Sequence, residues 1–580
     1  MKPLTLDKLC PQGITGTLAQ NITKNWLIGL RETNPAILDM FANRDKLPYR
    51  DLLPWSGEFA GKYITGAYYT YLLTKDEALR SYIEAFIDEL LTYQDEDGYL
   101  GVFSKACHLT GCFSQTPEQE LTEYKGNWDS WAHYHLMFGL YKWYCLNKKP
   151  KYMQAIEQIA ALYAKTFFNP QPGSKRLVDM ESSEMNLAPY HIFAILAAET
   201  GKTEYLHLAK EIEKDIADER AGNYLYYAQN GLDYYQCPKP RWESMHIIMG
   251  IAEMYRATGE KQYLDYAMQI FKSILRTDIH NTGAFSTNEQ AVGSPFREGA
   301  IETCCVIAYN ALAVTLYSLT GDTDILDFLE LSHYNAVLGY YNPTGRWSTY
   351  DTPMEGTKCA NYHSINFQCR PGSPDLNCCS VNAPRGAAEI AEWMLCEQDD
   401  IIYINNYEPL LAETPGFRLE ISSCYPAPGV ITLRLHTDTP RKVALRIPRW
   451  SKTTTLLVDG EPVTVNGNGY VFLPEHIYNG ESITLQLDFS VHYLDGQEQF
   501  AGKKSIYYGP LLFGCDTALT QMHPITELPA LSEKELSAAT PKFDQNGNIT
   551  LPLSNGITLC DFRMLGYTGA QYRTFFETKP

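Results

Sequence analysis

The chain has 580 residues, of which 45% are hydrophobic and 20% charged, and this composition excludes an intrinsically disordered protein. Its 68 acidic residues outnumber the 48 Lys and Arg, so the net charge is −20 and the surface repels phosphate backbones, which argues against a nucleic-acid partner. The 41 Tyr, 23 Phe and 9 Trp suit a Tyr-rich core and a sugar-binding cleft equally well.

Neither a leader nor a membrane span is predicted. The first residues lack an apolar stretch followed by small residues, and no run approaches the roughly eighteen consecutive apolar residues of a membrane helix. Fifteen cysteines form an odd number spread over a long chain, which favours free thiols in a reducing compartment over a disulfide framework. We therefore expect a cytoplasmic protein without membrane association.

A recurring turn motif predicts helical hairpins in the first part of the chain. In each copy an apolar helical stretch ends at a Gly or its equivalent, and an Asp, Thr or Lys begins the next helix. The copies are Thr74–Leu79, Asn147–Tyr152, Thr200–Leu206, Thr258–Leu264 and Thr320–Leu326, with a further unit expected around 385–397. This pattern predicts an (α/α)6 barrel. We prefer it to an open helical solenoid because the loops at the opposite end are long and rich in aromatic and polar residues.

After residue 400 the pattern changes to short alternating strands separated by Gly, Pro and Asn. Examples are Ile401–Asn405, Val430–Leu435, Val443–Ile447, Thr455–Gly460 and Ser482–Leu487. They predict an antiparallel β-sandwich, followed by a second β segment. The expected domains are an N-terminal segment that could join the β region (1–20), the barrel (21–397), a β-sandwich (398–495) and a second sandwich or segment (496–580).

Two cysteine pairs stand where loops lead into helices. Cys304 and Cys305 follow Glu302 just before an apolar helix, and Cys378 and Cys379 precede another. A helix N-terminus favours the thiolate, and three thiolates with a carboxylate would complete a tetrahedral zinc site. The alternative is ordinary buried thiols, because chance alone gives some adjacent pairs and C-x-x-C is the usual metal-binding spacing.

Other residues indicate a catalytic cleft. Glu289 lies in a loop before Glu302, where burial near a thiolate would raise its pKa into the range of a general acid, although most acids are surface charges. Aromatic and histidine clusters fall one to each repeat, away from the tight turns. The candidate cleft residues among them are Trp55, Trp131, His133, His135, Trp242 and His246.

Taken together, these motifs resemble glycoside hydrolase family 127, the β-L-arabinofuranosidase-type enzymes. The resemblance rests on Glu302-x-Cys304, on Cys378-Cys379 followed by Asn382 and Arg385, and on the upstream Glu289. It continues through Met185-Asn186, Ala444–Trp450 and Tyr508–Leu511, and it covers nearly the whole chain except about the last fifty residues.

The resemblance implies a retaining exo-glycosidase with an (α/α)6 barrel and β-sandwich domains. Zn²⁺ would be held by Glu302, Cys304, Cys378 and Cys379, with Cys378 as the nucleophile and Glu289 as the general acid/base. The substrate would be an oligosaccharide or glycoside with a terminal β-L-arabinofuranose or related furanose, and Asn186 would join the residues that bind it.

Several positions depart from the family pattern. Cys305 replaces a small residue without a thiol, Ser380-Val381 replaces Pro-Pro, and the loop from Glu289 to Glu302 is shorter. The family's pocket histidines do not fall cleanly onto His133, His135 or His246. The proposed catalytic residues and metal ligands therefore match the family better than the residues of the sugar pocket do. The sugar that this protein binds could accordingly differ from arabinofuranose.

Three questions stay open from the sequence. One alternative is a non-catalytic carbohydrate-binding barrel stapled by zinc, and another is a barrel lyase or epimerase; a Glu289 carboxylate beside the Cys378 sulfur would favour the hydrolase. Arg241, Arg297 and Arg370 could pair with an acidic sugar, but neighbouring acids are the preferred partners. The chain could also form a homodimer.

Overall fold

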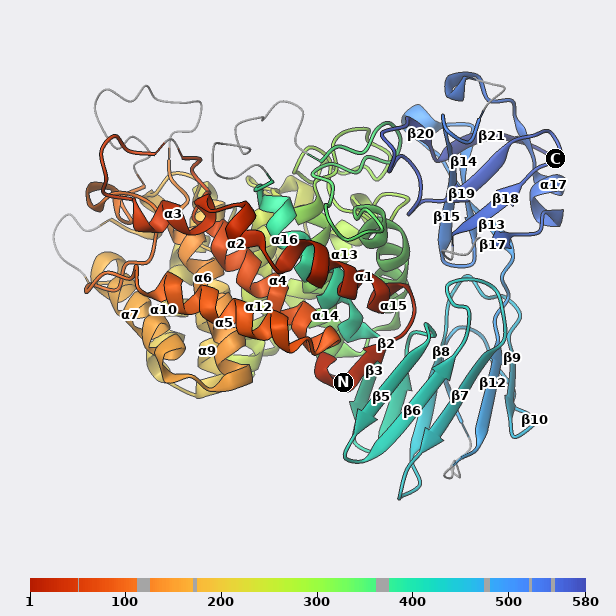
Figure 1. Ribbon diagram of the computed structural model, residues 1–580, viewed down its shortest axis with the longest axis horizontal. Helices are drawn as coiled ribbons and strands as arrows, with labels where there is room; N and C mark the ends of the chain where they lie inside the picture. Colours follow the sequence, from red (N-terminus) through yellow and green to blue (C-terminus); the bar gives the residue numbers. More distant parts are fainter. Residues whose placement is uncertain are drawn as a thin grey trace.

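The structure is a computed structural model. It describes residues 1–50, 52–111, 126–169, 175–360, 375–473, 480–520, 524–543 and 548–580. Arg370, one of the three arginines considered for an acidic ligand, lies outside the described residues. A helical domain carries two β regions at one end, one below the other in Figure 1.

Six helices among the described residues form the inner wall of the helical domain. They are almost wholly buried, so buried side chains lie around their whole circumference rather than along one stripe. Each packs against the next, and the last returns to the first, so the ring is closed. In chain order they are α4 (Glu58–Thr74), α6 (Asp129–Asn147), α9 (Pro189–Thr200), α12 (Met245–Thr258), α14 (Thr303–Thr320) and α16 (Cys378–Glu389).

Outer helices cover this ring, and the predicted tight turns connect the two layers. Gly201, Gly259 and Gly321 end their helices with φ of 67°, 75° and 68°, the left-handed conformation expected of a C′ glycine. Lys75 and Lys148 take the same conformation without a glycine. The outer helices after these turns are α5 (Glu77–Leu91), α7 (Pro150–Phe167), α10 (Thr203–Ile216), α13 (Lys261–Thr277) and α15 (Thr323–Leu331). The closed barrel is thus confirmed over the open solenoid.

The sixth unit differs from the expected hairpin around 385–397. After the inner helix α16 the chain passes through a short 3₁₀ turn, Ile390–Trp393, directly into a strand. An N-terminal helix, α1 (Ile14–Ile22), packs against both α16 and α4 instead. The sixth pair is therefore assembled from opposite ends of the domain, which a local turn motif cannot reveal. Shorter helices in the connections are α2 (Leu30–Thr33), α3 (Ala36–Ala42), α8 (Ser183–Asn186) and α11 (Tyr224–Gln229).

Two sheets form the sandwich beside the barrel. Within the described residues, one has the order β1-β3-β4-β8-β11 and the other β10-β9-β12-β7-β6-β5-β2. The N-terminal strands β1 (Lys2–Pro3) and β2 (Leu9–Pro11) thus enter different sheets. The other strands are β3 (Leu395–Gln398), β4 (Ile401–Ile404), β5 (Leu410–Thr414), β6 (Phe417–Ser422), β7 (Ile431–His436), β8 (Lys442–Ile447), β9 (Thr455–Val458), β10 (Glu461–Pro462), β11 (Gly469–Phe472) and β12 (Ser482–Gln486).

The C-terminal region forms a third sheet. Its first strand, β13 (Val491–Asp495), pairs with β14 (Lys503–Tyr508) rather than with the sandwich that precedes it. The other strands are β15 (Leu511–Asp516), β16 (Leu531–Ser532), β17 (Lys542–Phe543), β18 (Ile549–Pro552), β19 (Thr558–Asp561), β20 (Tyr572–Arg573) and β21 (Phe575–Lys579), with one helix, α17 (Glu533–Ala538).

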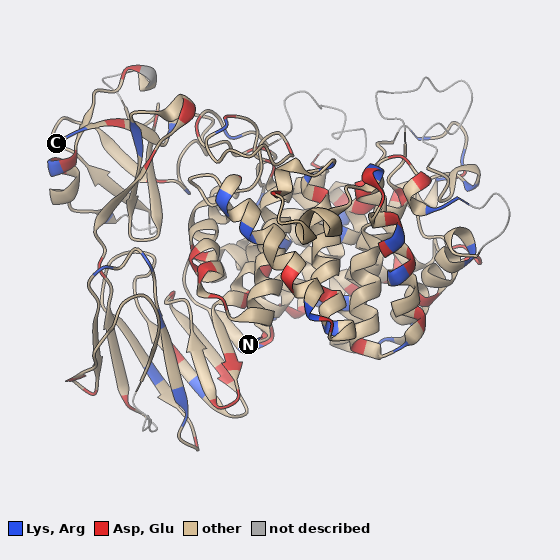
Figure 2. Cartoon of the chain, turned by 180° about the vertical axis from the view of Figure 1, so that it is seen from behind, with Lys and Arg blue, Asp and Glu red and all other residues tan. Residues whose placement is uncertain are grey.

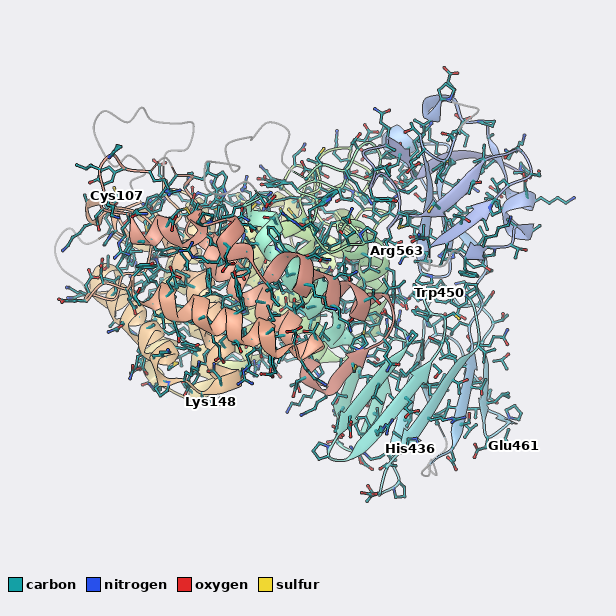
Figure 3. All side chains as sticks on the ribbon, viewed as in Figure 1. Cys107, Lys148, His436, Trp450, Glu461 and Arg563 are labelled. Carbon is teal, nitrogen blue, oxygen red and sulfur yellow. The ribbon has the colours of Figure 1, made fainter. Side chains whose placement is uncertain are left out.

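A barrel loop is hydrogen-bonded to the third sheet. The buried Lys358 ammonium donates to the carbonyl oxygens of Phe562 at 3.1 Å and Arg563 at 3.5 Å, and Figure 3 labels Arg563 beside the green loops of the barrel. Gly356 and Tyr572 exchange backbone hydrogen bonds of 2.9 and 2.8 Å. The C-terminal sheet therefore supports the 353–359 loop directly.

Charge and hydropathy of the described residues agree with this packing. Acidic and basic residues are interspersed along the helices in the view of Figure 2. Of the described helices, only α14 is long and apolar enough to cross a membrane by those measures, with a mean hydropathy of 1.4. Because 78% of that helix is buried inside the molecule, it matches a core helix of the barrel.

Candidate active site and metal centre

Four potential metal ligands come together at the N-termini of two neighbouring inner helices. Glu302 precedes the first residue of α14 and Cys304 follows it, while Cys378 and Cys379 are the first two residues of α16. All four are buried, and their ligand atoms lie within 4.8 Å of one another. The predicted loop-to-helix positions of both cysteine pairs are confirmed.

The spacing of these atoms fits a tetrahedral ion. The Cys379 sulfur lies 3.6 Å from that of Cys304 and 3.8 Å from that of Cys378. Glu302 Oε1 lies 3.3 Å from the sulfurs of both Cys378 and Cys379. Zinc–sulfur bonds of about 2.3 Å give tetrahedron edges of about 3.8 Å between sulfurs. The donor set therefore fits one thiophilic metal ion.

A capping box fixes the second cysteine pair. The Asn377 side chain accepts a hydrogen bond from the Ser380 amide at 2.8 Å, and the Ser380 hydroxyl accepts one from the Asn377 amide at 3.1 Å. These bonds satisfy amides at the start of α16 and set the direction in which its first residues leave the helix. Ser380, which departs from the family pattern, thus has a structural role here.

The three thiols differ in their surroundings. Cys304 and Cys379 have no exposed surface, whereas Cys378 is 5% exposed. The Cys304 sulfur accepts hydrogen bonds from Asn382 Nδ2 at 3.4 Å and Lys62 Nζ at 3.8 Å. The Cys378 sulfur lies 3.4 Å from the Tyr350 hydroxyl oxygen. Of the three, Cys378 is thus the thiol that a bound substrate could reach.

Glu289 stands at the tip of a tight hairpin. Thr287 and Gln290 exchange backbone hydrogen bonds of 3.0 and 3.1 Å around Asn288 and Glu289, whose φ angles are 47° and 67°. Positive φ at both central residues is the type I′ geometry, which favours Asn-Gly. A Glu in the second position costs about 1 kcal/mol or more in backbone energy. Such strain is typical of functional sites.

An arginine joins this hairpin to a second acid. Arg241 Nη2 lies 2.7 Å from Glu289 Oε2 and 2.7 Å from Glu243 Oε1, and its Nε donates to Glu243 Oε2 at 3.1 Å. The backbone repeats the link, since the Trp242 amide donates to the Glu289 carbonyl at 3.1 Å. The preferred sequence interpretation of Arg241, pairing with neighbouring acids, is therefore observed. Arg297 is exposed on the surface.

The acids of the two loops influence one another and the metal ligands. Burial raises the pKa of Glu243 to about 7, even though Arg241 lowers it. Burial also raises the pKa of Glu302 well above its ordinary range, and the charges of Cys304 and Glu289 add to that shift. The Glu289 carboxylate is thus near enough to Glu302 to act on it electrostatically. A divalent cation would oppose these shifts, because it stabilises the ionised form of each ligand.

A buried ion pair contacts the proposed metal ligand Cys304. Lys62 and Glu58, one turn apart on α4, are 1% exposed each, and their charged atoms lie 2.9 Å apart. The Lys62 ammonium also faces the rings of Trp131 and Trp242 at 5.5 and 5.4 Å, and the Trp131 indole N–H donates to Glu58. This pair was not predicted from the sequence. A Glu and a Lys four residues apart, in a helix whose other residues are mostly apolar, could have indicated a buried ion pair.

Replacing Lys62 with Met should lower the thermal unfolding midpoint, because it leaves the Glu58 charge buried without a partner. The expected loss is about 3–5 kcal/mol of stability. The double variant with Glu58→Gln removes both charges and should recover at least half of the loss. A Lys62→Met protein as stable as wild type would show that Glu58 is not held as a buried charge.

Four predicted cleft residues form one aromatic wall beside the metal ligands. The Trp131 ring lies 4.5 Å from His135, 4.9 Å from His246 and 5.9 Å from Trp242. Burial lowers the pKa of both histidines well below the ordinary range, so they are neutral. Trp242 Nε1 and His135 Nε2 are buried and have no hydrogen-bond partner among the described residues. Sugar hydroxyls would supply such partners.

The other three predicted cleft residues have different surroundings. The Leu100 amide donates to His133 Nε2 at 3.1 Å, and Nδ1 donates to the Asp129 carbonyl at 2.7 Å, so both ring nitrogens are used by the backbone. Asn186 is likewise occupied, because its amide donates to the carbonyls of residues 127 and 181. The Trp55 ring lies 5.0 Å from that of Trp128, which in turn lies 6.5 Å from that of Trp131, so Trp128 separates Trp55 from the aromatic wall. The structure gives His133 and Asn186 roles in holding loops.

Cys305 is a buried thiol adjacent to the four ligands but not one of them. Its sulfur lies 3.8 Å from Glu302 Oε2, and burial raises its pKa well above the ordinary range. All cysteines among the described residues are free. The additional thiol therefore packs behind the metal ligand Glu302 as a small apolar residue.

The closed (α/α)6 barrel thus carries a buried Glu/Cys/Cys/Cys group that could hold a metal ion, with an adjacent carboxylate and an aromatic wall, and these features suit a glycoside hydrolase. The model of the catalytic domain of family 127 β-L-arabinofuranosidases matches residues 29–392, and the model of the middle domain of these enzymes matches residues 401–489. The chain therefore belongs to glycoside hydrolase family 127.

Individual relatives are distant in sequence. A non-reducing end β-L-arabinofuranosidase of Bifidobacterium longum subsp. longum is 22% identical over 504 residues, which are 78% of this chain and 74% of the relative. A family 127 β-arabinofuranosidase structure matches with a TM-score of 0.80 at 17% identity, covering 100% of this chain and 98% of its own. A β-L-arabinofuranosidase from Geobacillus stearothermophilus T6 matches with a TM-score of 0.76 at 15% identity, covering 98% and 100%. These two structures support the fold.

Proposed function

We propose that the protein is a retaining exo-glycosidase that removes a terminal β-L-arabinofuranose or a related furanose from oligosaccharides. The relative from Bifidobacterium longum carries that activity in its name. Of the two reacting groups, Cys378 is 5% exposed and the Glu289 side chain is 26% exposed, so the nucleophile is nearly enclosed while the acid/base stands at the opening of the site. A buried site of this kind admits the end of a chain rather than its middle.

The single observation that carries the proposal is the difference between the three thiols. Cys378 alone among the four grouped ligands has both exposed surface at its side chain and a hydroxyl neighbour in Tyr350. Cys304 is covered by Lys62 and Asn382, and Cys379, whose sulfur lies 3.6 Å from that of Cys304, has no exposed surface. Cys378 is therefore the nucleophile, and Cys304 and Cys379 are ligands.

In the first step the Cys378 sulfur attacks the anomeric carbon. A carbon–sulfur bond forms as the bond to the glycosidic oxygen breaks, and that oxygen takes a proton from Glu289. Arg241 and the hairpin hold Glu289, so its carboxyl is already placed when the substrate binds. The aromatic wall excludes water and binds the sugar through Trp242 Nε1 and His135 Nε2.

In the second step water releases the sugar. Glu289, now ionised, accepts a proton from a water molecule while the water oxygen attacks the anomeric carbon. The carbon–sulfur bond breaks and restores the Cys378 thiolate. Two inversions give net retention of configuration. A purely structural metal staple has no need of a strained hairpin carrying Glu289 beside it, which favours the hydrolase over a non-catalytic barrel.

Zinc is the proposed metal, held by Glu302, Cys304, Cys378 and Cys379. When bound, it keeps its thiol ligands ionised at neutral pH, so the nucleophile needs no separate base. Protein purified without chelator should therefore contain about one zinc per chain by mass spectrometry of metals. A Cys304→Ser variant should lose most of it. Wild-type protein free of any transition metal would contradict the site.

A panel of p-nitrophenyl glycosides tests the proposed activity. The β-L-arabinofuranoside should be hydrolysed with retention, and prolonged chelation should abolish that hydrolysis while added zinc restores it. Pyranosides and α-L-arabinofuranosides serve as controls and should react at least about a hundredfold more slowly. If the enzyme prefers a glycoside of another sugar, the proposed retaining mechanism stands but the assignment of the substrate is wrong.

A further inference from the structure

A cavity of about 600 Å³ opens between the catalytic loops and the C-terminal sheet. Its polar and aromatic lining includes Glu298, Asp351, Cys359, Gln571, Tyr572 and Arg573. In Figure 1 the green loops of the barrel that contribute to it lie beside strand β20 of the C-terminal sheet. The volume falls within the range of ligand pockets, about 300–1,000 Å³.

The cavity adjoins the loop that carries the proposed acid/base. Ala300, which lines it, exchanges hydrogen bonds of 2.8 and 3.0 Å with Asn288, the residue before Glu289. Asp351, on the same wall, forms a backbone bridge with the metal ligand Glu302. The cavity thus borders both the Glu289 hairpin and the metal centre.

Asp351 is a buried carboxylate with no hydrogen-bond partner among the described residues. It is 4% exposed, and neither carboxylate oxygen has a hydrogen bond among the described residues. Leaving a buried acceptor unpaired costs about 1–3 kcal/mol, which a ligand hydroxyl would recover.

We infer that this cavity binds the aglycone, the neutral sugar unit that departs with the glycosidic oxygen, and that Asp351 accepts hydrogen bonds from its hydroxyl groups. The inference rests on the proposed function. Because Glu289 protonates the glycosidic oxygen, whatever is attached to that oxygen must lie on the Glu289 side of the broken bond. The cavity adjoins the Glu289 hairpin through Ala300, which lines it and is hydrogen-bonded to Asn288.

The charges of the lining favour a neutral aglycone over an anionic one. Glu298, Asp351 and Glu355 line the cavity together with one arginine, Arg573, whose Nε lies 3.8 Å from Glu355 Oε2, so a carboxylated sugar would meet a net negative surface. Gln571 and Tyr572 add an amide and an aromatic ring, the groups that bind sugar hydroxyls and sugar faces. The C-terminal sheet thereby supplies part of the substrate site.

The test compares two substrates with the same terminal sugar. One is the p-nitrophenyl glycoside that the wild-type enzyme cleaves best, and the other is a disaccharide in which that sugar is joined to a second neutral sugar. Asp351→Asn should lower the ratio of kcat/KM for the disaccharide to that for the aryl glycoside by about tenfold, and Gln571→Ala by about threefold. Gln571 is exposed, so its variant should fold even if Asp351→Asn does not.

Glu577→Gln is the matched control. It removes an exposed charge from the same C-terminal sheet outside the cavity and should leave the ratio unchanged. If the wild type cleaves both substrates but Asp351→Asn and Gln571→Ala alter both rates equally, the aglycone site is wrong and the proposed function stands. If the wild type cleaves no glycoside, the proposed function fails and the inference falls with it.

Discussion

Replacing Cys378 with Ser is expected to lower kcat by at least about 10⁴-fold on every substrate, including activated aryl glycosides. A serine hydroxyl is neither a soft metal ligand nor ionised at neutral pH, so the anomeric carbon loses its nucleophile whatever the leaving group. Three of the four grouped ligands remain, and metal content should fall but not vanish. Steady-state kinetics and metal analysis on one preparation check both effects.

Cys237→Ser provides a matched control for the loss of a buried thiol. Cys237 is 4% exposed in a barrel loop and does not belong to the ligand group. Its variant should retain wild-type kcat within about twofold, since it removes no reacting group. A Cys378→Ser enzyme within about tenfold of wild type would show that another residue attacks the sugar.

Replacing Glu289 with Ala is expected to separate substrates by their leaving groups. On a disaccharide, whose departing oxygen needs a proton, kcat/KM should fall by about 10³-fold, whereas a dinitrophenyl glycoside should lose far less in its first step. Azide, a small anion that needs no general base, should speed the second step of the variant and give a glycosyl azide with retained configuration. Metal content should be unchanged, because Glu289 is not a ligand.

Gln290→Ala controls for damage to the hairpin. Gln290 is exposed and contributes its backbone to the turn, so the variant should behave as wild type. Equal losses by Glu289→Ala on both classes of substrate, without an effect of azide, would assign Glu289 to holding the loop rather than to proton transfer.

Features that depend on neighbouring residues could be predicted from the sequence. The tight turns ending at Gly201, Gly259 and Gly321 carry their own signal, and so does the position of each cysteine pair where a loop leads into a helix. The face on which a helical residue lies is equally local. Trp131 and His135 are four residues apart and share a face of the helix, whereas His133 between them points to the opposite side. Helical spacing alone therefore predicts that His133 does not belong to the aromatic wall.

Features that depend on distant contacts could not be predicted. Arg241 meets Glu289 across 48 residues, and Lys62 meets Cys304 across 242. The sixth barrel unit takes α1 from the other end of the domain. The contribution of the C-terminal sheet to the 353–359 loop is of the same kind. One sequence does not show which distant residues are in contact, because the residues next to each partner in the sequence do not indicate the other partner.

The most direct test is to trap the sugar on the enzyme and locate it by peptide mass spectrometry. Rapid acid quenching of Glu289→Ala with a dinitrophenyl β-L-arabinofuranoside should accumulate the intermediate, because departure of the activated leaving group needs no acid but hydrolysis still needs the base. We expect one pentosyl group on the peptide that contains Cys378, and fragmentation should place it on Cys378 rather than Cys379. A pentosyl group on Glu302, or on no residue at all during turnover with retention, would contradict the account.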